Sequence, residues 1–221
     1  MSELYADIFT REFDENKSIT DITFDKFLAY QLEHLTVQWN IAWGSQITSQ
    51  EFDSFNYLFT EWYLDPTLAQ QLIEKTATIT KTMKWSWNHG DHNQYNIFEN
   101  GVIDLEDSFY GPIWYDTITS LSQNFWFPDP IKWEVWEFMR QHSFSKTQLK
   151  TYFTEIQKNT LWIDFMNSDI FGALFLMRAV FVTVKTDGLP LLRKYRYNKL
   201  THAVQAYLKG ENMINYFISL Y

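Results

Sequence analysis

The sequence predicts a mostly α-helical domain with one small β-hairpin near its middle. Apolar residues recur every three or four positions along most of the chain, which is the spacing of amphipathic helices. Around residues 85–103 this pattern gives way to a polar stretch, in which Asn100 and Gly101 separate two short apolar runs. An Asn-Gly pair in that setting is a strong hairpin signal. The length of 221 residues fits a single domain over residues 1–221.

The first half of the chain carries three predicted helices, over residues 24–39, 49–62 and 66–83. The first has its apolar residues at helical spacing and a capping residue in Asp21 or Thr23. Pro66 follows Asp65 at the start of the third helix, where proline is well tolerated because a first-turn N–H has no helical partner.

Helical periodicity returns after Pro112 and continues to the end of the chain. Proline-containing breaks interrupt it twice, at residues 128–130 and 187–190. Ser145 and Gln148 have the spacing of a capping box. The most apolar stretch, Phe171–Val184, contains Arg178 and is too short to span a membrane, so it predicts a buried helix. A final helix follows the second break.

The composition excludes several classes of protein. The chain is 46% hydrophobic, 20% charged and 19% aromatic, which is enough apolar material for a real core. It has no cysteine, which excludes a disulfide scaffold, a cysteine-ligated metal and a thiol nucleophile. A net charge of −9 argues against nucleic acid as a partner, because nucleic-acid binding needs a basic surface. No signal peptide or membrane span is found, so we expect a cytoplasmic protein with no membrane partner.

The segment of residues 85–116 carries the candidate chemistry. It contains His89-Gly90-Asp91-His92-Asn93-Gln94-Tyr95-Asn96, then the hairpin, then Ile103-Asp104-Leu105-Glu106-Asp107. Phosphoryl transfer needs a carboxylate for the incoming hydroxyl and oxygen ligands for Mg²⁺. Asp91, Asn96 and Asp104 supply this set, since a hairpin brings its two ends together and lets Asn96 and Asp104 share one metal.

The pattern His-Gly-Asp-x-x-x-x-Asn, followed by a hairpin and Ile-Asp-Leu-Glu-Asp, resembles the aminoglycoside phosphotransferase/choline kinase family. That family has a protein-kinase-like fold. Residues 110–116, Tyr-Gly-Pro-Ile-Trp-Tyr-Asp, look like the family's Gly-x-Pro-x-x-Tyr-Asp stretch. Residues 61–64 and 171–190 resemble segments of bacterial kinases that act on the cell-wall amino sugars N-acetylmuramate and N-acetylglucosamine. The resemblance spans roughly residues 50–208.

The resemblance implies a role for each residue of the motif. Asp91 would be the catalytic base, and His89 would brace the loop. Asn96 and Asp104 would hold Mg²⁺ on the phosphates of ATP, the two cofactors of the family. Three further acidic residues would contact the substrate or orient the loop: Glu106, Asp107 and Asp116. Asp116 is the more structural of these, and the substrate would be a small hydroxylated molecule such as a sugar or amino sugar.

The sequence departs from the family before His89. The family has a small N-terminal lobe with a Gly-containing phosphate loop and a strand lysine, whereas the residues before His89 have helical patterns. No two of the seven glycines stand close enough to form a Gly-rich loop. The chain therefore resembles the C-terminal lobe alone, and we expect a protein partner to supply the missing lobe. The alternative is a non-catalytic, degenerate kinase-like module that binds a partner.

Several other polar and aromatic residues have plainer interpretations. His92 is predicted to be an exposed loop histidine rather than a ligand or base. The remaining candidate histidines are predicted to lie on the surface or in the core: His34, His142 and His202. Three tryptophans are predicted to pack in the core rather than stack on a sugar: Trp126, Trp133 and Trp136. A basic cluster is predicted to form a solvated helix face: Arg193, Lys194, Arg196 and Lys199. For the Glu106-Asp107 pair, a solvated acidic pair and a substrate contact remain equal alternatives.

Overall fold

The computed structural model describes residues 24–42, 65–93, 96–98, 101–126, 144–158, 164–184 and 190–221. These ranges form helices α2 (Phe24–Ile41), α4 (Pro66–Thr80), α5 (Tyr115–Ser122), α7 (Lys146–Gln157), α8 (Ser168–Val184), α9 (Pro190–Leu208) and α10 (Met213–Ser219). The strands are β1 (Trp85–Asn88), β2 (Ile97–Phe98), β3 (Gly101–Val102) and β4 (Phe109–Pro112), and short 3-10 turns are η2 (Leu105–Asp107) and η3 (Gln123–Trp126). The predicted mostly helical fold with a small hairpin is confirmed.

The four short strands form two antiparallel pairs, one nested inside the other. In the inner pair, β2 and β3 form the predicted hairpin, with Ile97 opposite Val102 and Phe98 opposite Gly101. The outer pair joins β1 to β4, and it was not predicted from the sequence. Because β1 ends at Asn88 and β4 begins at Phe109, the outer pair closes a loop that carries the whole candidate motif.

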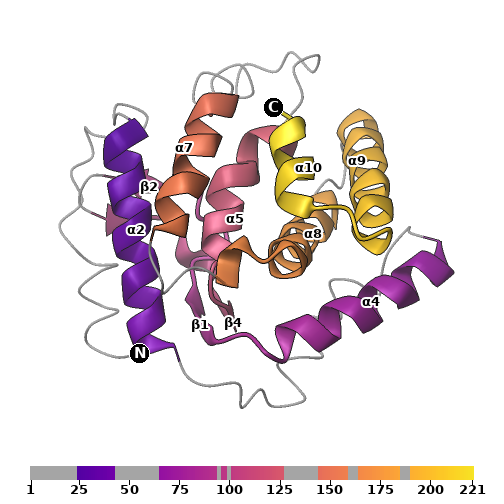
Figure 1. Cartoon of the computed structure of the whole chain (residues 1–221), viewed down its shortest axis with the longest axis horizontal. Helices are drawn as coiled ribbons and strands as arrows, with labels where there is room; N and C mark the ends of the chain where they lie inside the picture. Colours follow the sequence, from indigo (N-terminus) through magenta and orange to yellow (C-terminus); the bar gives the residue numbers. More distant parts are fainter. Residues whose placement is uncertain are drawn as a thin grey trace.

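Helix α8 is the central element of the core. Every residue from Phe171 to Val180 is buried, and α8 contacts α4, α5, α9 and α10. A helix covered on all sides needs apolar residues all round, which explains why this stretch has no polar face. Figure 1 shows α5 and α8 in the middle of the fold, with α2 on one side and α9 on the other. The predicted buried helix is confirmed.

The predicted helix starts are confirmed where the structure describes them. The Asp65 carboxylate accepts hydrogen bonds from the backbone N–H groups of Thr67 and Leu68, with Pro66 in the first turn. At α7, the Ser145 hydroxyl accepts from the Gln148 N–H at 3.2 Å. The Gln148 side chain accepts from the Ser145 N–H at 2.8 Å, which completes the capping box.

The C-terminal end of the chain differs from the prediction in two ways. The final helical region consists of two helices, α9 and α10, which are separated at Gly210, a residue in the left-handed conformation with φ of 76°. Arg196, predicted to lie on a solvated face of α9, is buried and donates to the backbone carbonyls of Trp126 and Val182. Its carbonyl partners explain how the guanidinium is tolerated there. Trp126 is fully buried, as predicted.

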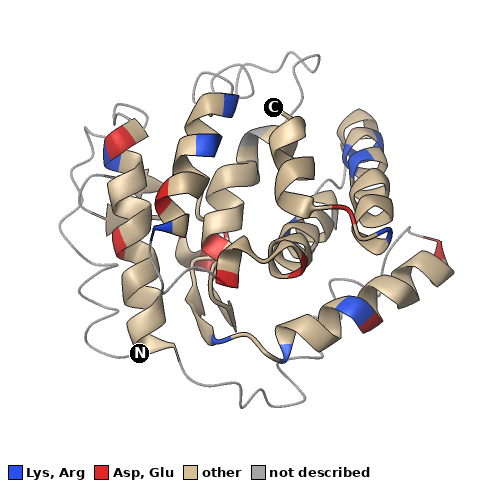
Figure 2. Ribbon diagram, in the orientation of Figure 1, with Lys and Arg blue, Asp and Glu red and all other residues tan. Residues whose placement is uncertain are grey.

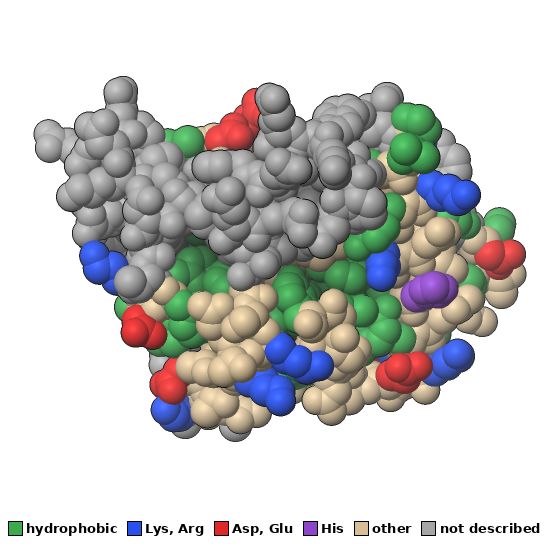
Figure 3. Space-filling view, turned by 90° about the horizontal axis from the view of Figure 1, so that it is seen from above, with side chains coloured by type: hydrophobic (Ala, Val, Ile, Leu, Met, Phe, Trp, Pro, Cys, Tyr) green, Lys and Arg blue, Asp and Glu red, His purple; other side chains and the backbone are tan. Residues whose placement is uncertain are grey.

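The surface carries charge on several helices, including α9 and α7 (Figure 2). Seen from above, hydrophobic side chains gather in the middle of one face, and charged side chains are scattered along its lower edge (Figure 3). Among the described helices, none combines the length and apolar character needed to cross a membrane. Several predicted features lie outside the described residues: the α2 cap at Asp21 or Thr23, the helix over 49–62, the breaks at 128–130 and 187–189, the segment 61–64, Trp133, Trp136 and His142.

Gly172 in α8 provides a test of this packing. A Cβ built there would lie 2.6 Å from the ring of Tyr207 and 2.7 Å from Met213 Cγ. The ring cannot easily move, because it is buried and its hydroxyl donates to the carbonyl of Asp169. We expect Gly172→Ala to lower the free energy of unfolding by about 1–2 kcal/mol, although alanine favours helices. Urea unfolding followed by circular dichroism measures the change, with the exposed α9 substitution Asn198→Ala as control; an equally stable Gly172→Ala would contradict the packing.

Candidate active site

The candidate site is the loop that follows β1. Gly90 in this loop has φ of 84°, a conformation that residues with a side chain rarely adopt. A Cβ at this position would also lie 2.0 Å from the backbone oxygen of Asp107. The loop therefore passes directly against the residues that follow the hairpin, and only glycine fits at the point of contact.

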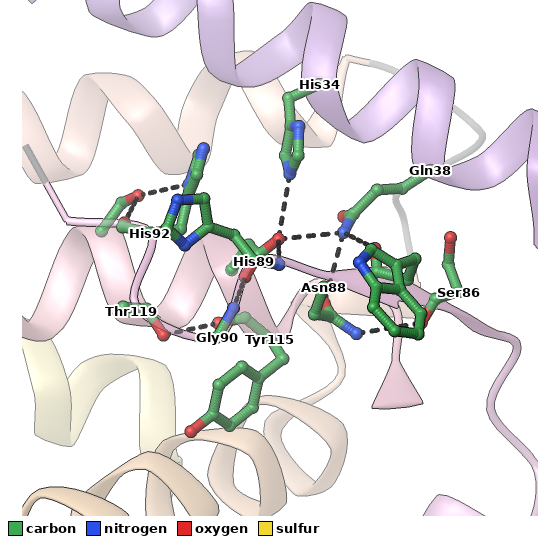
Figure 4. A network of polar contacts seen from close by, with 12 residues as sticks. His34, Gln38, Ser86, Asn88, His89, Gly90, His92, Tyr115 and Thr119 are labelled. Carbon is green, nitrogen blue, oxygen red and sulfur yellow. Dashed lines mark hydrogen bonds and ion pairs between the residues drawn. The ribbon is translucent and has the colours of Figure 1, made fainter. Parts of the chain in front are cut away.

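The loop is held on its buried side by the carboxylate of Asp116, a fully buried residue at the start of α5. The carboxylate accepts hydrogen bonds from the backbone N–H of His89 at 2.9 Å and of Gly90 at 3.1 Å. From α2, His34 Nε2 donates to it at 3.1 Å and Gln38 Nε2 at 3.2 Å (Figure 4). Burial raises the pKa of Asp116, but the His34 hydrogen bond and the neighbouring histidines outweigh it, so the pKa lies well below its usual range.

Asp91 lies at the open side of the loop, and its side chain is 27% exposed. Its Oδ1 accepts from Arg178 Nη2 at 2.8 Å, and its Oδ2 accepts from the side-chain amides of Asn93 at 2.9 Å and Asn96 at 3.3 Å. An ionised carboxylate has about four acceptor positions. These contacts leave one position, on Oδ1, for a further donor such as a hydroxyl. Burial raises the pKa of Asp91, but the charge of Arg178 and its hydrogen bond lower the pKa by more than burial raises it. The pKa is therefore below its usual value.

Arg178 reaches this loop from the apolar helix α8. Its side chain is 3% exposed, and besides Asp91 it donates through Nη1 to the backbone carbonyl of Gly90 at 3.2 Å. Burial lowers the pKa of Arg178, whereas Tyr115 and Asp91 raise it to a value above its usual one. Sequence reasoning noted this arginine but gave it no role. The available signal was a single arginine in an apolar run, because a buried arginine needs an acidic partner.

The hairpin brings Asn96 and the residue before Asp104 together. The Ile103 N–H donates to the Asn96 carbonyl at 2.9 Å, while His89 Nε2 donates to the Ile103 carbonyl at 2.7 Å. The Asn96 amide nitrogen donates to the backbone carbonyl of Asp91 at 2.9 Å, which leaves its amide oxygen available to a ligand. Asp104 is exposed and has φ of 62°, a left-handed conformation that costs about 1–2 kcal/mol in a non-glycine residue.

The donor set at this end of the hairpin suits Mg²⁺. An amide oxygen and a carboxylate are hard oxygen ligands, and Mg²⁺ keeps several waters when few protein ligands are present. Within the described residues, no group of three or more His, Asp or Glu side chains could hold a metal ion. Asn96 and Asp104 stay the predicted pair of Mg²⁺ ligands, with water completing the coordination. Of the other predicted acidic residues, Glu106 is exposed and Asp107 is half-buried, both on η2.

His92 is fully buried, so the prediction of an exposed loop histidine is wrong. The Ser120 hydroxyl donates to the His92 carbonyl, and His92 Nδ1 therefore donates back to Ser120 Oγ at 3.0 Å. The ring stacks on His34, with ring centroids 4.5 Å apart. Burial and the neighbouring His34 together hold the pKa of His92 well below its usual range. His34 is a buried core histidine, one of the two environments predicted for it, and His202 is exposed.

Comparison of the chain with protein-family models, with curated proteins and with solved structures finds no match. The candidate site is therefore characterised by its own contacts. A buried carboxylate fixes the loop backbone, a buried arginine pairs with the half-buried carboxylate of Asp91, and the side-chain amide of Asn96 donates to Asp91.

The buried state of His92 generates a pH prediction. The unfolded chain binds a proton at a free histidine below about pH 6.5, whereas folded His92 does not, so stability is lost as the pH falls through that value. We expect the free energy of unfolding to decrease by up to about 1.4 kcal/mol per pH unit between pH 7 and 5 from this residue. Urea titrations at several pH values measure the slope.

His92→Asn keeps a donor near Ser120 and removes the titrating ring, so its slope is expected to be flatter. The matched control is His202→Asn, which changes an exposed histidine of α9 and should retain the original slope. An unchanged slope in His92→Asn would show that His92 is not the buried neutral group described above.

Proposed function

We propose that this chain carries the catalytic loop of a phosphotransferase, which moves the γ-phosphoryl group of ATP, with Mg²⁺, to a hydroxyl of a small substrate such as a sugar or amino sugar. The supporting observation is the arrangement at Asp91. Its carboxylate is ionised, held by Arg178, and has one acceptor position open at a partly exposed side. A carboxylate in that state can align an incoming hydroxyl and accept its proton.

The two neighbouring oxygen ligands support the same proposal. The amide nitrogen of Asn96 donates a hydrogen bond to Asp91, which leaves the amide oxygen for a metal. Asp104 directly follows Ile103, whose N–H donates to the Asn96 carbonyl across the hairpin. Asn96 and Asp104 would hold Mg²⁺. The metal, when bound, neutralises charge on the phosphates during transfer. Glu106 and Asp107 follow directly on η2 and are proposed to face the substrate.

We extend the proposal to the finer fold, the C-terminal lobe of a protein-kinase-like fold. The order of elements supports it. The loop at residues 89–96 follows a strand, the β2–β3 hairpin comes next, then Asp104, then β4 and α5 with the bracing Asp116. The aminoglycoside phosphotransferase/choline kinase family, which the chain resembles, has its catalytic-loop motif, its hairpin and its metal-binding aspartate in the same order.

The nucleotide cradle is the part that the described residues do not supply. The residues that the structure describes before His89 are 24–42 and 65–88. They contain no Gly-rich loop and no strand that carries a lysine. ATP therefore does not fit these residues alone. We propose that another segment or a partner protein supplies this lobe.

Metal binding tests the proposal without requiring the missing lobe. Mn²⁺ can replace Mg²⁺ as a spectroscopic probe, and its free concentration is measured by electron paramagnetic resonance. We expect the 221-residue chain to bind Mn²⁺ without nucleotide, and Asp104→Ala to bind it about 10- to 100-fold more weakly. The control is Asp164→Ala, an exposed aspartate on the turn before α8. Equal binding by the unmodified chain and Asp104→Ala would contradict the metal site.

Turnover tests the role of Asp91. In a screen of hexoses and amino sugars for ADP release, run with the partner or segment that supplies the nucleotide lobe, we expect Asp91→Asn to lose at least about 100-fold in rate, because asparagine cannot accept the hydroxyl proton. The substitution also leaves buried Arg178 without its counter-charge, so rates are referred to the folded fraction. Arg196→Met, which removes the other buried arginine, serves as a destabilised control with unchanged turnover per folded molecule. Equal and measurable ADP release by Asp91→Asn and the unmodified chain would refute the assignment.

A further inference from the structure

We propose that Arg178 is a positioning residue of the catalytic loop, which fixes the Asp91 carboxylate and, through it, the metal-facing amide of Asn96. The inference rests on the proposed function, because it assigns the residue that keeps the proposed base and metal ligand in place. It adds a residue from α8, since Arg178 stands 87 positions after Asp91 in the sequence.

One guanidinium holds the loop at two points. Nη1 donates to the Gly90 carbonyl at 3.2 Å and Nη2 to Asp91 Oδ1 at 2.8 Å. The planar fork of arginine makes these two contacts at a fixed geometry, so the carboxylate is oriented relative to its own backbone. A lysine would supply the charge but, as a single point charge on a flexible stem, would orient the carboxylate less well.

The contact continues to the proposed metal ligand. With Oδ1 held by Arg178, the Asp91 Oδ2 atom accepts from Asn93 and Asn96, and the Asp91 carbonyl also accepts from the Asn96 amide. Both contacts of the Asn96 amide nitrogen are therefore made to Asp91. If the Asp91 side chain turns, Asn96 loses its contact with Oδ2 and keeps only the one with the Asp91 backbone carbonyl, so its amide is held less firmly.

Packing alone does not explain an arginine at this position. Its neighbours in α8 are buried and apolar, and an apolar residue of similar volume can replace a buried ion pair without loss of stability. The charge therefore serves the loop rather than the core. Arg196 offers a direct contrast, because it is also buried but contacts the backbone carbonyls of Trp126 and Val182.

The experiment compares Mn²⁺ binding, without nucleotide, in the full chain and in Arg178→Met, Arg178→Lys, Arg196→Met and Asp104→Ala. We expect Arg178→Met to weaken Mn²⁺ binding about 10-fold or more, the effect typical of losing a residue that orients a metal ligand. Arg178→Lys should recover part of this loss, because it restores the charge. Arg196→Met should unfold at a lower temperature but bind Mn²⁺ like the unmodified chain, as a structural arginine would.

Four outcomes decide between the possibilities. Unchanged Mn²⁺ affinity in Arg178→Met, with the expected loss in Asp104→Ala, overturns the inference and leaves the proposed metal site standing. An equal loss in Arg178→Met and Arg196→Met overturns it as well, because the effect would then be structural. Unchanged affinity in Asp104→Ala overturns the proposed function and the inference together. Should Arg178→Met fail to fold, full Mn²⁺ affinity in Arg178→Lys, which keeps the charge and loses the fork, would overturn the inference.

Discussion

The buried carboxylate of Asp116 is the interaction on which the rest of the candidate site depends. A charge inside a protein must be matched by donors, and here the donors are two backbone N–H groups of the loop and the side chains of His34 and Gln38. Satisfying this one carboxylate therefore forces the loop, α2 and α5 into a single arrangement. The loop backbone is fixed before any ligand arrives, which is how preorganised sites avoid rearrangement during a reaction.

A salt bridge between Arg178 and Asp91 holds the same loop. The contacts of Asp116 and those of Arg178 hold different groups of the loop. Asp116 fixes the N–H groups of His89 and Gly90, and Arg178 fixes the carbonyl of Gly90 and the carboxylate of Asp91. Between them the peptide at Gly90 is held at both ends. The apolar packing of α8 against its neighbours provides the rigid platform from which Arg178 reaches the loop.

Much of the secondary structure could be predicted because its signals are local. The cap at Asp65, the capping box at Ser145 and the β2–β3 hairpin each depend on residues within a few positions of one another. The hairpin is confirmed, but Gly101 lies in β3 opposite Phe98 and not in the turn that the Asn-Gly pair indicated. The wrong predictions concern residues whose environment depends on elements distant in the sequence. His92 was predicted to be exposed and Arg196 solvated, because their neighbours in sequence are polar, yet α2 covers the first and η3 packs against the second. The β1–β4 pair also escaped prediction, since its two strands are too short to show a pattern of their own.

The candidate residues of the loop, Asp91, Asn96 and Asp104, were chosen from the sequence alone, because their spacing around a hairpin is a local property of the chain. What only the tertiary structure decided is how these residues are held and charged. The partner of Asp91 lies on α8 and that of the loop backbone on α5, and α2 supplies His34. Such pairings arise when helices distant in sequence pack together around a shared core. Periodicity and spacing do not encode these pairings, because a buried charge pairs with a group that is close in the folded structure and not in the sequence.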